Sequence, residues 1–353
     1  RRSHAVTDLG GDPLAARRFP TDTHAAQTMR AVLHTRYGDP SVLTVGDIPL
    51  PVPRDDQVLI RIHAAGVSIG DHHIVTGKPY LVRLTSYGGL PGPRNLVPGG
   101  ALAGQVEQVG SQVTDFRPGD GVFGQVAHGA FADYAAIPAG LLTLKPASLS
   151  FEESAAIPWG TTALQGLRDA GRLRPGQRVL INGASGAVGT WAVQLGKALG
   201  AHVTAVCSTR NVALVTDLGA DAVIDYGTTD FVASGPQFDL MLDLVGNRTL
   251  ADCRAILVPG GRYVACAGGR GSEWLGPIGA MAWGLFSNLF SNTKFTPMLQ
   301  SLGQADLQIL RDLIDSGRVR PVVERVWSLS EVVVALQHVG EGHSRGLQVL
   351  RLA

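Results

Sequence analysis

The sequence predicts an α/β protein: a Rossmann doubly wound parallel sheet plus a β-rich domain. Three features of the chain predict this. Within residues 178–211 a Gly-rich turn joins an apolar run to a helix-spaced run. Strand-like and helix-like segments alternate after that turn, and short strands with Pro-rich turns fill the chain before it. A chain of 353 residues is also longer than one hydrophobic core usually serves, so we expect two domains.

Residues 1–28 are rich in Arg, Asp, Thr and Ala and show no apolar periodicity. This composition predicts a disordered tail. Asp8, Asp12 and Asp22 argue against a transit peptide, and the segment has no apolar signal core.

The chain from Met29 is predicted to be β-rich, because Pro-rich turns such as Leu50-Pro51-Val52-Pro53-Arg54 separate short apolar runs. The predicted strands are Arg30–Thr35, Leu43–Ile48, Gln57–Val67, Gly104–Val109 and Gly121–Gln125. A helix is predicted over Phe151–Ala170. Glu152 and Glu153 would lie in its first turn, where the helix dipole favours acids.

The Gly-rich turn is the centre of a predicted βαβ unit. Val179–Ile181 forms the first apolar run, Val203–Val206 forms the second, and apolar residues recur between them at helical spacing. The turn resembles the dinucleotide fingerprint with Ala in its first position: Ala184-Ser185-Gly186-Ala187-Val188-Gly189. Such a turn brings backbone amides and a helix N-terminus against a pyrophosphate. We therefore predict that Ser185, Gly186, Ala187 and Val188 bind the cofactor.

The end of the second strand bears on which cofactor binds. An NAD site usually has Asp or Glu there, to hold the ribose 2′-hydroxyl. This chain has Cys207-Ser208-Thr209-Arg210-Asn211, with no acid and one Arg. A guanidinium suits the 2′-phosphate of NADPH, because it can bond a phosphate through two N–H groups. NADPH is the predicted cofactor, and a solvated turn with a chance Arg stays open as the alternative.

The rest of the chain continues the alternation. Strands are predicted at Ala222–Tyr226, Leu240–Val245 and Arg262–Ala267, and Gly246 and Gly268 then lie where the nicotinamide half of a cofactor binds. After them the chain predicts a helix over about 304–316, a strand Val322–Trp327, a helix Ser330–Val339 and a strand Gly346–Leu352. We expect the C-terminal segment to return to the β-rich domain. The predicted domains are 29–158 with 300–353, and 159–299.

Composition excludes several functions. A net charge of +1 gives no sign of nucleic-acid binding. Three scattered cysteines do not make a disulfide framework, which favours a reducing cytoplasm. Residues 274–290 are the most apolar stretch, but Pro277, Gly279, Gly284 and Asn288 argue against a membrane span. A lid or dimer segment and ordinary core packing both stay open for it.

Several motifs together resemble the zinc-free, quinone-oxidoreductase-like branch of the medium-chain dehydrogenases/reductases. The resemblance covers about residues 29–353 and implies a GroES-like β domain, a Rossmann domain, an active site in the cleft between them and, often, a homodimer. Its motifs are Ala64-Ala65-Gly66-Val67-Ser68-Ile69-Gly70-Asp71, Phe116-Arg117-Pro118-Gly119-Asp120-Gly121-Val122, Gly129-Ala130-Phe131-Ala132-Asp133-Tyr134, Thr162-Ala163, the Gly183–Gly189 turn and Leu218-Gly219-Ala220-Asp221-Ala222-Val223-Ile224-Asp225-Tyr226.

The resemblance also implies that no metal is bound. Zinc-containing relatives have Cys where this chain has Ser68, and Gly-His-Glu where it has Gly99-Gly100-Ala101. Gly100 and Ala101 supply no ligand atom, and a catalytic zinc needs three protein ligands. His72 and His73 are adjacent, and we interpret them as surface or cleft-lining residues rather than as a metal pair.

Further site residues follow from the resemblance. Thr162 resembles a Thr near the cofactor at the domain junction, and Arg345 resembles a C-terminal Arg that reaches the cofactor. Ser208, Arg210 and Tyr226 resemble positions around the 2′-phosphate. Tyr226 as an aromatic at the edge of the core and Arg345 as a surface Arg stay open.

The loop with Ser68, Asp71 and Tyr80 faces the nicotinamide in relatives. Ser68 or Tyr80 is predicted to donate a hydrogen bond to the substrate oxygen, while Asp71 is equally compatible with capping a helix. The chain departs from its relatives at Ser68, where Asn is common, at Ala101, where an acid is common, and at Leu347, where Lys is common.

The predicted function is zinc-independent transfer of hydride from NADPH to a small apolar quinone or α,β-unsaturated carbonyl. In these substrates the charge that arrives at carbon is delocalised onto oxygen, so one hydrogen-bond donor suffices. The altered loop residues keep an alternative open, a non-catalytic NADPH-binding protein.

Overall fold

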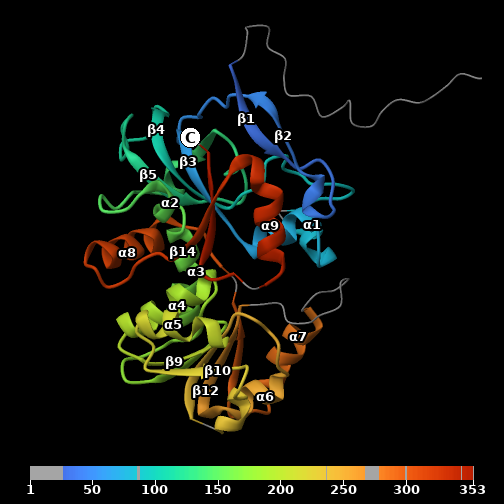
Figure 1. The fold of residues 1–353 in the computed structure, drawn as a ribbon, viewed down its shortest axis with the longest axis vertical. Coiled ribbons are helices and arrows are strands. Elements are labelled where there is room, and N and C mark those ends of the chain that lie inside the picture. The colour runs from blue at the N-terminus through green and yellow to red at the C-terminus, as the bar shows by residue number, and fades with distance from the viewer. Residues whose placement is uncertain are drawn as a thin grey trace, which may run out of the picture.

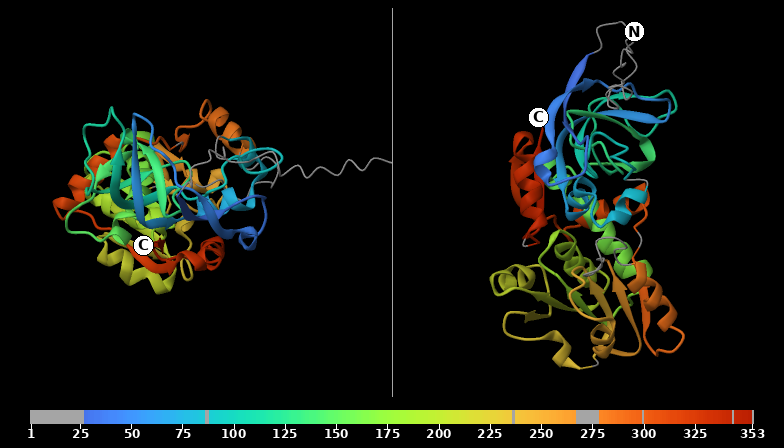
Figure 2. Two further views of the ribbon diagram at one scale, coloured as in Figure 1. Left: turned by 90° about the horizontal axis from the view of Figure 1, so that it is seen from above. Right: turned by 90° about the vertical axis from the view of Figure 1, so that its right-hand side faces the viewer.

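A computed structural model describes residues 27–85, 88–235, 237–266, 278–298, 300–342 and 344–352. The chain forms two lobes stacked along the long axis of the molecule (Figures 1 and 2). Residues 1–26 of the predicted tail lie outside the described residues. The last residue of that predicted tail, Thr28, already opens strand β1 and pairs with Pro49, so regular structure begins slightly earlier than expected.

The upper lobe in Figure 1 contains a seven-stranded sheet of order β14-β15-β3-β4-β5-β7, with β6 paired to β3. Strands β14 and β15 come from the C-terminus, and β15 pairs antiparallel with β3. A two-stranded sheet of β1 and β2 completes the lobe. The strands are β1 (Thr28–Leu33), β2 (Thr44–Pro49), β3 (Gln57–Val67), β4 (Ala101–Val109), β5 (Gly121–Gln125), β6 (Tyr134–Pro138), β7 (Leu142–Leu144), β14 (Val323–Ser328) and β15 (Leu347–Arg351).

One hydrophobic cluster forms the core of this lobe. Ile60, Leu102 and Phe131 are fully buried in it, and Ala335 and Leu336 of helix α9 (Val332–Gly340) pack into the same cluster. Helix α1 (Ile69–Thr76) contacts α9 so closely that a Cβ on Gly340 would lie 2.6 Å from His72 Nε2. The lobe therefore holds α1 against the C-terminal segment of the chain.

The lower lobe contains a six-stranded parallel sheet of order β10-β9-β8-β11-β12-β13. This is the Rossmann strand order, which confirms the predicted fold class. The strands are β8 (Arg178–Asn182), β9 (His202–Cys207), β10 (Ala222–Asp225), β11 (Phe238–Asp243), β12 (Leu257–Ala265) and β13 (Lys294–Pro297). The helices between them are α4 (Ala187–Ala198), α5 (Val212–Asp217), α6 (Leu250–Ala255) and α7 (Ile278–Ser287).

The helix predicted over Phe151–Ala170 is not continuous, which corrects the sequence-based expectation. It divides into α2 (Phe151–Ser154), a 3₁₀ turn η4 (Ile157–Trp159), α3 (Gly160–Gln165) and a π-helical turn η5 (Gly166–Ala170). Pro158 lies in the 3₁₀ turn, where its missing N–H and its ring oppose a regular helix. In the π turn, Gly171 N donates to Gly166 O.

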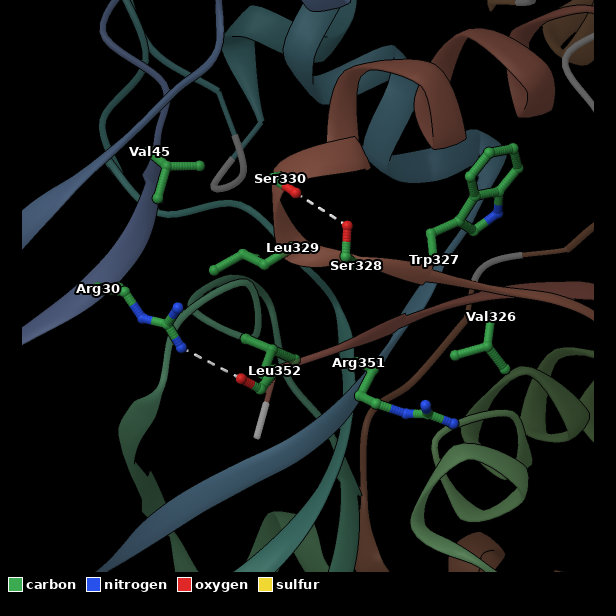
Figure 3. A pocket seen from close by; sticks show the side chains of 9 residues that line it. All are labelled: Arg30, Val45, Val326, Trp327, Ser328, Leu329, Ser330, Arg351 and Leu352. Carbon is green, nitrogen blue, oxygen red and sulfur yellow. Dashed lines mark hydrogen bonds between the residues drawn. The ribbon is translucent and has the colours of Figure 1, made fainter.

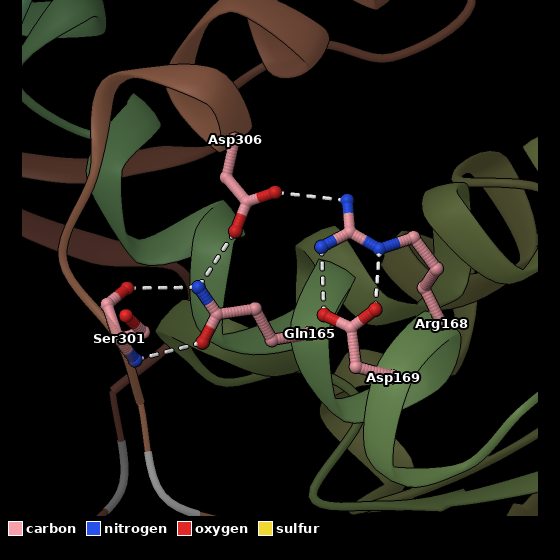
Figure 4. Close-up of polar contacts among 5 residues, drawn as sticks. All are labelled: Gln165, Arg168, Asp169, Ser301 and Asp306. Atoms are coloured by element: carbon pink, nitrogen blue, oxygen red, sulfur yellow. Dashed lines mark hydrogen bonds and ion pairs between the residues drawn. The ribbon is translucent and has the colours of Figure 1, made fainter.

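These segments join the two lobes through polar contacts with the chain that returns from the lower lobe. Gln165 Nε2 donates to Ser301 O at 2.8 Å, and Ser301 N donates to Gln165 Oε1 at 3.0 Å. Arg168 bonds Asp169 and also Asp306 of helix α8 (Gln304–Asp315), as Figure 4 shows. The two crossings between the lobes are therefore tied to each other.

Short 3₁₀ segments complete the described secondary structure; the one at Leu329–Glu331 overlaps the predicted helix Ser330–Val339, and the sequence pattern did not predict the others. They are η1 (Pro40–Val42), η2 (Tyr80–Leu84), η3 (Ala139–Leu141), η6 (Thr209–Asn211), η7 (Phe231–Ser234) and η8 (Leu329–Glu331).

Candidate cofactor and substrate site

The Gly-rich turn lies at the carboxyl end of β8, where close packing requires glycine. Gly183 has a φ of 86°, and a Cβ on it would lie 2.7 Å from Val245 Cγ2. A Cβ on Gly189 would lie 2.1 Å from Gly183 O, so α4 packs directly on the turn. Gly186 is the N-cap of α4, and the amides of Ala187 and Val188 follow in its first turn. Such amides have no acceptor within the helix and suit an anion.

The three residues predicted around a 2′-phosphate lie on one edge of the sheet. β9 and β10 pair in parallel with Cys207 opposite Asp225, so Ser208 and Tyr226 follow adjacent strand ends. Tyr226 is 57% exposed, and Arg210 is exposed in η6. The Asp225 carboxylate accepts a hydrogen bond from Gly227 N at 2.9 Å. Burial and the nearby Asp225 raise the pKa of the Cys207 thiol to about 11, which leaves Cys207 neutral.

Asn211 lies at the same edge and was not predicted from the sequence as a site residue. Its Nδ2 donates to Ser185 Oγ at 2.9 Å and to Ser208 Oγ at 3.2 Å. One buried amide thus connects the Gly-rich turn to the turn after β9. A polar residue at a predicted turn is too common to be singled out from sequence alone.

The loop after β11 is held by a buried carboxylate that sequence reasoning also missed. Asp243 is 1% exposed and accepts from Asn182 Nδ2, Val245 N, Gly246 N and Tyr263 Oη at 2.9–3.0 Å. Burial and the neighbouring Asp243 raise the pKa of the Tyr263 hydroxyl, which therefore stays protonated as a donor. Gly246, a predicted cofactor residue, has a φ of 69° in this loop. Gly268, another predicted cofactor residue, lies outside the described residues.

The C-terminal segment of the upper lobe contacts the Gly-rich turn. Gly346 forms a parallel bridge with Gly186, and Gly346 N donates to Ser185 O at 2.9 Å. Arg345 is exposed, and its backbone N donates to Glu324 Oε2 at 2.7 Å. The bridge places Arg345 next to the N-terminus of α4, although Arg345 comes 158 residues after Ala187, the first residue of that helix.

Thr162 lies in the first turn of α3 and is half-buried. α3 packs on α4, since a Cβ on Gly160 would lie 3.0 Å from the Trp191 ring. The preceding residue, Thr161, is buried and donates to Gln125 Oε1 at 2.9 Å. Thr162 therefore lies on the segment that joins the lobes.

Ser68 and Asp71 form a buried capping box at the start of α1. Ser68 Oγ donates to Asp71 Oδ2 at 2.8 Å, Ser68 N donates to the same oxygen at 2.9 Å, and Asp71 N donates to Ser68 Oγ at 3.3 Å. Gly100 N also donates to Asp71. Burial nevertheless raises the pKa of the Asp71 carboxyl to about 6. Asp71 thus caps the helix, and the Ser68 hydroxyl proton is engaged by Asp71.

Tyr80 is half-buried and begins the 3₁₀ segment η2. The Arg83 guanidinium lies over the Tyr80 ring at 4.6 Å and over the Tyr37 ring at 4.4 Å. Ser68 therefore lies at the start of α1, and Tyr80 lies on the segment that follows the end of α1.

Among the described residues, no group of three or more His, Cys, Asp or Glu side chains is arranged to hold a metal ion. A Cβ on Gly100 would lie 3.8 Å from both Asp71 Oδ1 and Trp159, so the carboxylate is the ionisable neighbour of that position. The rings of His72 and His73 lie 6.1 Å apart at 71°, and burial lowers the pKa of both. Across all the residues that the structure describes, no helix has the length and the apolar composition needed to cross a bilayer.

A cavity of about 640 Å³ lies away from this site, on the upper lobe between β2, β14 and the C-terminal residues (Figure 3). Its two arginines are already engaged: Arg30 bonds Asp133 at 3.0 Å, and Arg351 bonds Glu152 at 2.8 Å. The cavity is therefore a poor candidate for binding an anionic cofactor.

Two family models match the chain. Residues 54–147 match the alcohol dehydrogenase GroES-like domain, and residues 218–350 match the zinc-binding dehydrogenase model. The chain is 31% identical to a quinone oxidoreductase of Sus scrofa, over 90% of this chain and 95% of that protein. It is also 31% identical to a 2-methylene-furan-3-one reductase of Solanum lycopersicum, over 95% of this chain and 82% of that protein.

Solved structures show the same similarity. The quinone oxidoreductase from Coxiella burnetii matches with a TM-score of 0.80 and 28% identity, covering 93% of this chain and 100% of that one. The similarity therefore extends over both lobes and is not limited to the dinucleotide-binding motif.

Proposed function

Because this chain belongs to the medium-chain dehydrogenase/reductase family, with quinone-oxidoreductase-like relatives, we propose that it transfers hydride from NADPH to a quinone or an α,β-unsaturated carbonyl without zinc. The family makes it an NAD(P)H-dependent oxidoreductase. The observation that carries the proposal is the bridge between Gly186 and Gly346, which joins the Gly-rich turn to the upper lobe. A cofactor on that turn would lie at the junction of the two lobes.

The residues at the carboxyl edge of the lower sheet fit a dinucleotide. The amides of Ala187 and Val188 would hold the pyrophosphate at the positive end of α4. The loop fixed by Asp243, which contains Gly246, would position the nicotinamide half. Arg345 would approach the phosphates from the upper lobe, because its neighbour Gly346 bonds Ser185.

The preference for NADPH is proposed from the edge formed by Ser208, Arg210 and Tyr226. A 2′-phosphate there would meet one guanidinium and two hydroxyls. The Asp225 carboxylate is turned to the amide of Gly227, which moderates its repulsion of the phosphate.

Zinc-independent reduction is proposed from the donor set around Ser68. The positions that hold metal ligands in zinc relatives are Ser68, Gly100 and Ala101, and they offer one hydroxyl and no imidazole, thiolate or carboxylate. A quinone or enone needs only a hydrogen-bond donor at its oxygen. The bound cofactor supplies the hydride, and the chain positions the two reactants and the proton.

We propose that Ser68 is this donor and that Asp71 controls its proton. When Asp71 is protonated, its carboxyl can donate to Ser68 Oγ, and the Ser68 proton becomes available to the substrate oxygen. The proton would then pass from Asp71 through Ser68 as the substrate oxygen gains charge. Tyr80, on the neighbouring segment η2, is the second proposed donor.

The test is NADPH oxidation by metal-free protein against benzoquinone, naphthoquinone, an alkenal and a cyclic enone, with NADH in parallel. We expect turnover with NADPH preferred. Arg210→Ala should raise the KM for NADPH about tenfold or more, because a charge-assisted phosphate contact contributes about 1.5–3 kcal/mol. Arg117→Ala, an exposed arginine of the upper lobe, is the matched control and should behave as wild type. Equal use of NADH by the wild type would contradict the cofactor proposal.

The hydrogen bond between Ser68 and Asp71 also supports a second candidate function, a non-catalytic NADPH-binding protein, because it engages the proposed donor. Saturable NADPH binding without turnover of any compound in the panel, at pH values on both sides of 6, would favour this candidate.

We also propose a homodimer in a reducing cytoplasm. The cysteines are free thiols, which supports such a compartment. In and after α7, Trp283 is 62% exposed, Phe286 54% and Phe290 79%, and an apolar surface of this kind is typical of an interface. Light scattering should give twice the chain mass, and Phe290→Glu should shift the protein to the monomer. A monomeric wild type would contradict the proposal.

A further inference from the structure

We propose that Asn211 determines the cofactor preference by leaving the hydroxyl protons of Ser185 and Ser208 available for the 2′-phosphate of NADPH. This inference rests on the proposed function, since it assumes that a dinucleotide binds at the carboxyl edge of the lower sheet. It adds a residue that does not itself touch the phosphate, and it explains how two hydroxyls from different turns act together.

The geometry begins with one shared nitrogen. Asn211 is 4% exposed and lies at the end of η6, just before α5. Its Nδ2 donates to Ser185 Oγ at 2.9 Å and to Ser208 Oγ at 3.2 Å. Ser185 follows β8 and Ser208 follows β9, and these strands pair in parallel. The amide therefore holds two hydroxyls on adjacent turns at the carboxyl edge of the lower sheet.

The chemistry follows from the number of protons. A primary amide nitrogen carries two hydrogens, and each is used on one serine oxygen. A serine oxygen that accepts from the amide still has its own proton to donate. In the part of the chain that the structure describes, neither hydroxyl proton is given to a protein acceptor. Two donors thus remain for a ligand, and a phosphate has several acceptor oxygens.

The carbonyl oxygen of the Asn211 side chain also supports a functional role. Within the described residues, Asn211 Oδ1 is buried without a hydrogen-bond partner. A buried carbonyl oxygen without a donor carries an energetic cost that the two hydrogen bonds from Nδ2 must offset. The position makes sense when the amide nitrogen serves to orient the serines.

The position of Ser208 favours the 2′-phosphate over the pyrophosphate as the group that the hydroxyls bind. Ser208 follows the second strand of the βαβ unit, and the ribose substituent of a dinucleotide lies at the end of that strand. The pyrophosphate has its own donors, the amides in the first turn of α4. Arg210 attracts an anion by charge, whereas the two hydroxyls bond it only in a defined direction.

The experiment compares dissociation constants of the full-length wild type and its variants for NADPH, NADH, 2′,5′-ADP and 5′-AMP. Asn211→Ala should weaken NADPH and 2′,5′-ADP about tenfold, the effect of losing roughly one well-oriented hydrogen bond. NADH and 5′-AMP should change less than about twofold, within the scatter of a lost neutral contact. Thr216→Ala is the matched control, because Thr216 lies on α5 and its hydroxyl bonds only Val212 O among the described residues.

Asn211→Asp is the second variant, and it reverses the chemistry. Its carboxylate accepts a hydrogen bond from each serine hydroxyl, so these protons no longer point to the ligand, and it adds a negative charge beside the phosphate. We expect the affinity for NADPH to fall about a hundredfold, more than in Asn211→Ala, because charge repulsion adds to the lost donors. Since the carboxylate still joins both serines, this variant tests the proposal even if Asn211→Ala does not fold.

A double variant tests whether Asn211 acts through the serine. Adding Asn211→Ala to Ser208→Ala should weaken NADPH binding less than the two separate effects combined, because residues in one network are not additive. Equal weakening of NADPH and NADH in Asn211→Ala would overturn the inference and assign Asn211 a structural role. Unchanged NADPH binding in both Asn211 variants would also overturn it. A wild type without NADPH preference would instead refute the proposed cofactor selection, and the wild-type measurements alone would show this.

Discussion

The Ser68 hydroxyl donates a 2.8 Å hydrogen bond to Asp71 Oδ2, and both residues are buried at the N-terminus of α1. The contact explains two properties of the site. It caps a helix that packs against the C-terminal segment, and it connects the proposed substrate donor to a carboxyl whose pKa is raised to about 6 by burial.

The first prediction concerns stability and pH. Because the folded-state pKa of Asp71 lies above its unfolded value of 3.8, the folded protein holds this proton more tightly. The stability from the neutral carboxyl is therefore fully present below about pH 4 and is lost as pH rises through about 6. Over that window Asp71 lowers the free energy of unfolding by about 3 kcal/mol. The free energy of unfolding of Asp71→Asn, measured with urea, should not show this loss as the pH rises. If wild type and variant show the same pH dependence, the burial effect is absent.

The second prediction concerns turnover. Ser68→Ala combined with Tyr80→Phe should lower kcat about a hundredfold, the usual effect of removing a donor to a developing oxyanion. The KM for NADPH should stay within about twofold, since neither residue lies at the carboxyl edge of the lower sheet, where the cofactor is proposed to bind. Steady-state kinetics at saturating NADPH measures both constants. Unchanged turnover in the double variant would eliminate both residues as donors.

The third prediction concerns the Gly-rich turn. A Cβ on Gly189 would lie 2.1 Å from Gly183 O, so Gly189→Ala should destabilise the protein by about 1–3 kcal/mol through overpacking. Gly140→Ala is the matched control, because no atom lies within 4 Å of its Cβ position. Thermal unfolding of the two variants compares them directly. A Gly189→Ala protein as stable as Gly140→Ala would mean that α4 can move away from the turn.

The fourth prediction concerns the loop after β11. Tyr263→Phe removes one of the donors to the buried Asp243 carboxylate and should cost about 1.5–3 kcal/mol of unfolding free energy. The KM for NADPH should rise as well, because Asp243 also holds the amide of Gly246. Tyr134→Phe, on β6 of the other lobe, is the control. A stability loss with an unchanged KM would show that the loop does not position the cofactor.

The fifth prediction concerns metals. Chelator treatment should leave turnover unchanged within error, and elemental analysis of the active protein should find less than stoichiometric zinc. The reason is that Ser68, Gly100 and Ala101 supply too few ligands for a catalytic zinc. Activity that is lost on chelation and restored by zinc would refute the zinc-independent mechanism.

Local patterns in the sequence predicted most of the regular elements. β3 and β5 have the predicted bounds, Gln57–Val67 and Gly121–Gln125, because their apolar residues end at glycines or polar turns. The helix predicted from Phe151 was wrong in its continuity. Its residues have helical periodicity, but Pro158 and the packing at Gly160 divide the segment. For helix α1 the sequence left open only that Asp71 caps a helix, without bounds, because eight residues with two histidines show little periodicity.

The sequence by itself determined the fold class, the family and the position of the Gly-rich turn, because each of these follows from local patterns along the chain. Only the tertiary structure decided which distant residues meet. Asp243 accepts from Tyr263 and Asn182, Gly346 bonds Ser185, and Asn211 joins Ser185 to Ser208. Parallel strands bring their carboxyl ends to one edge whatever lies between them in sequence, and burial then decides which polar groups must pair there.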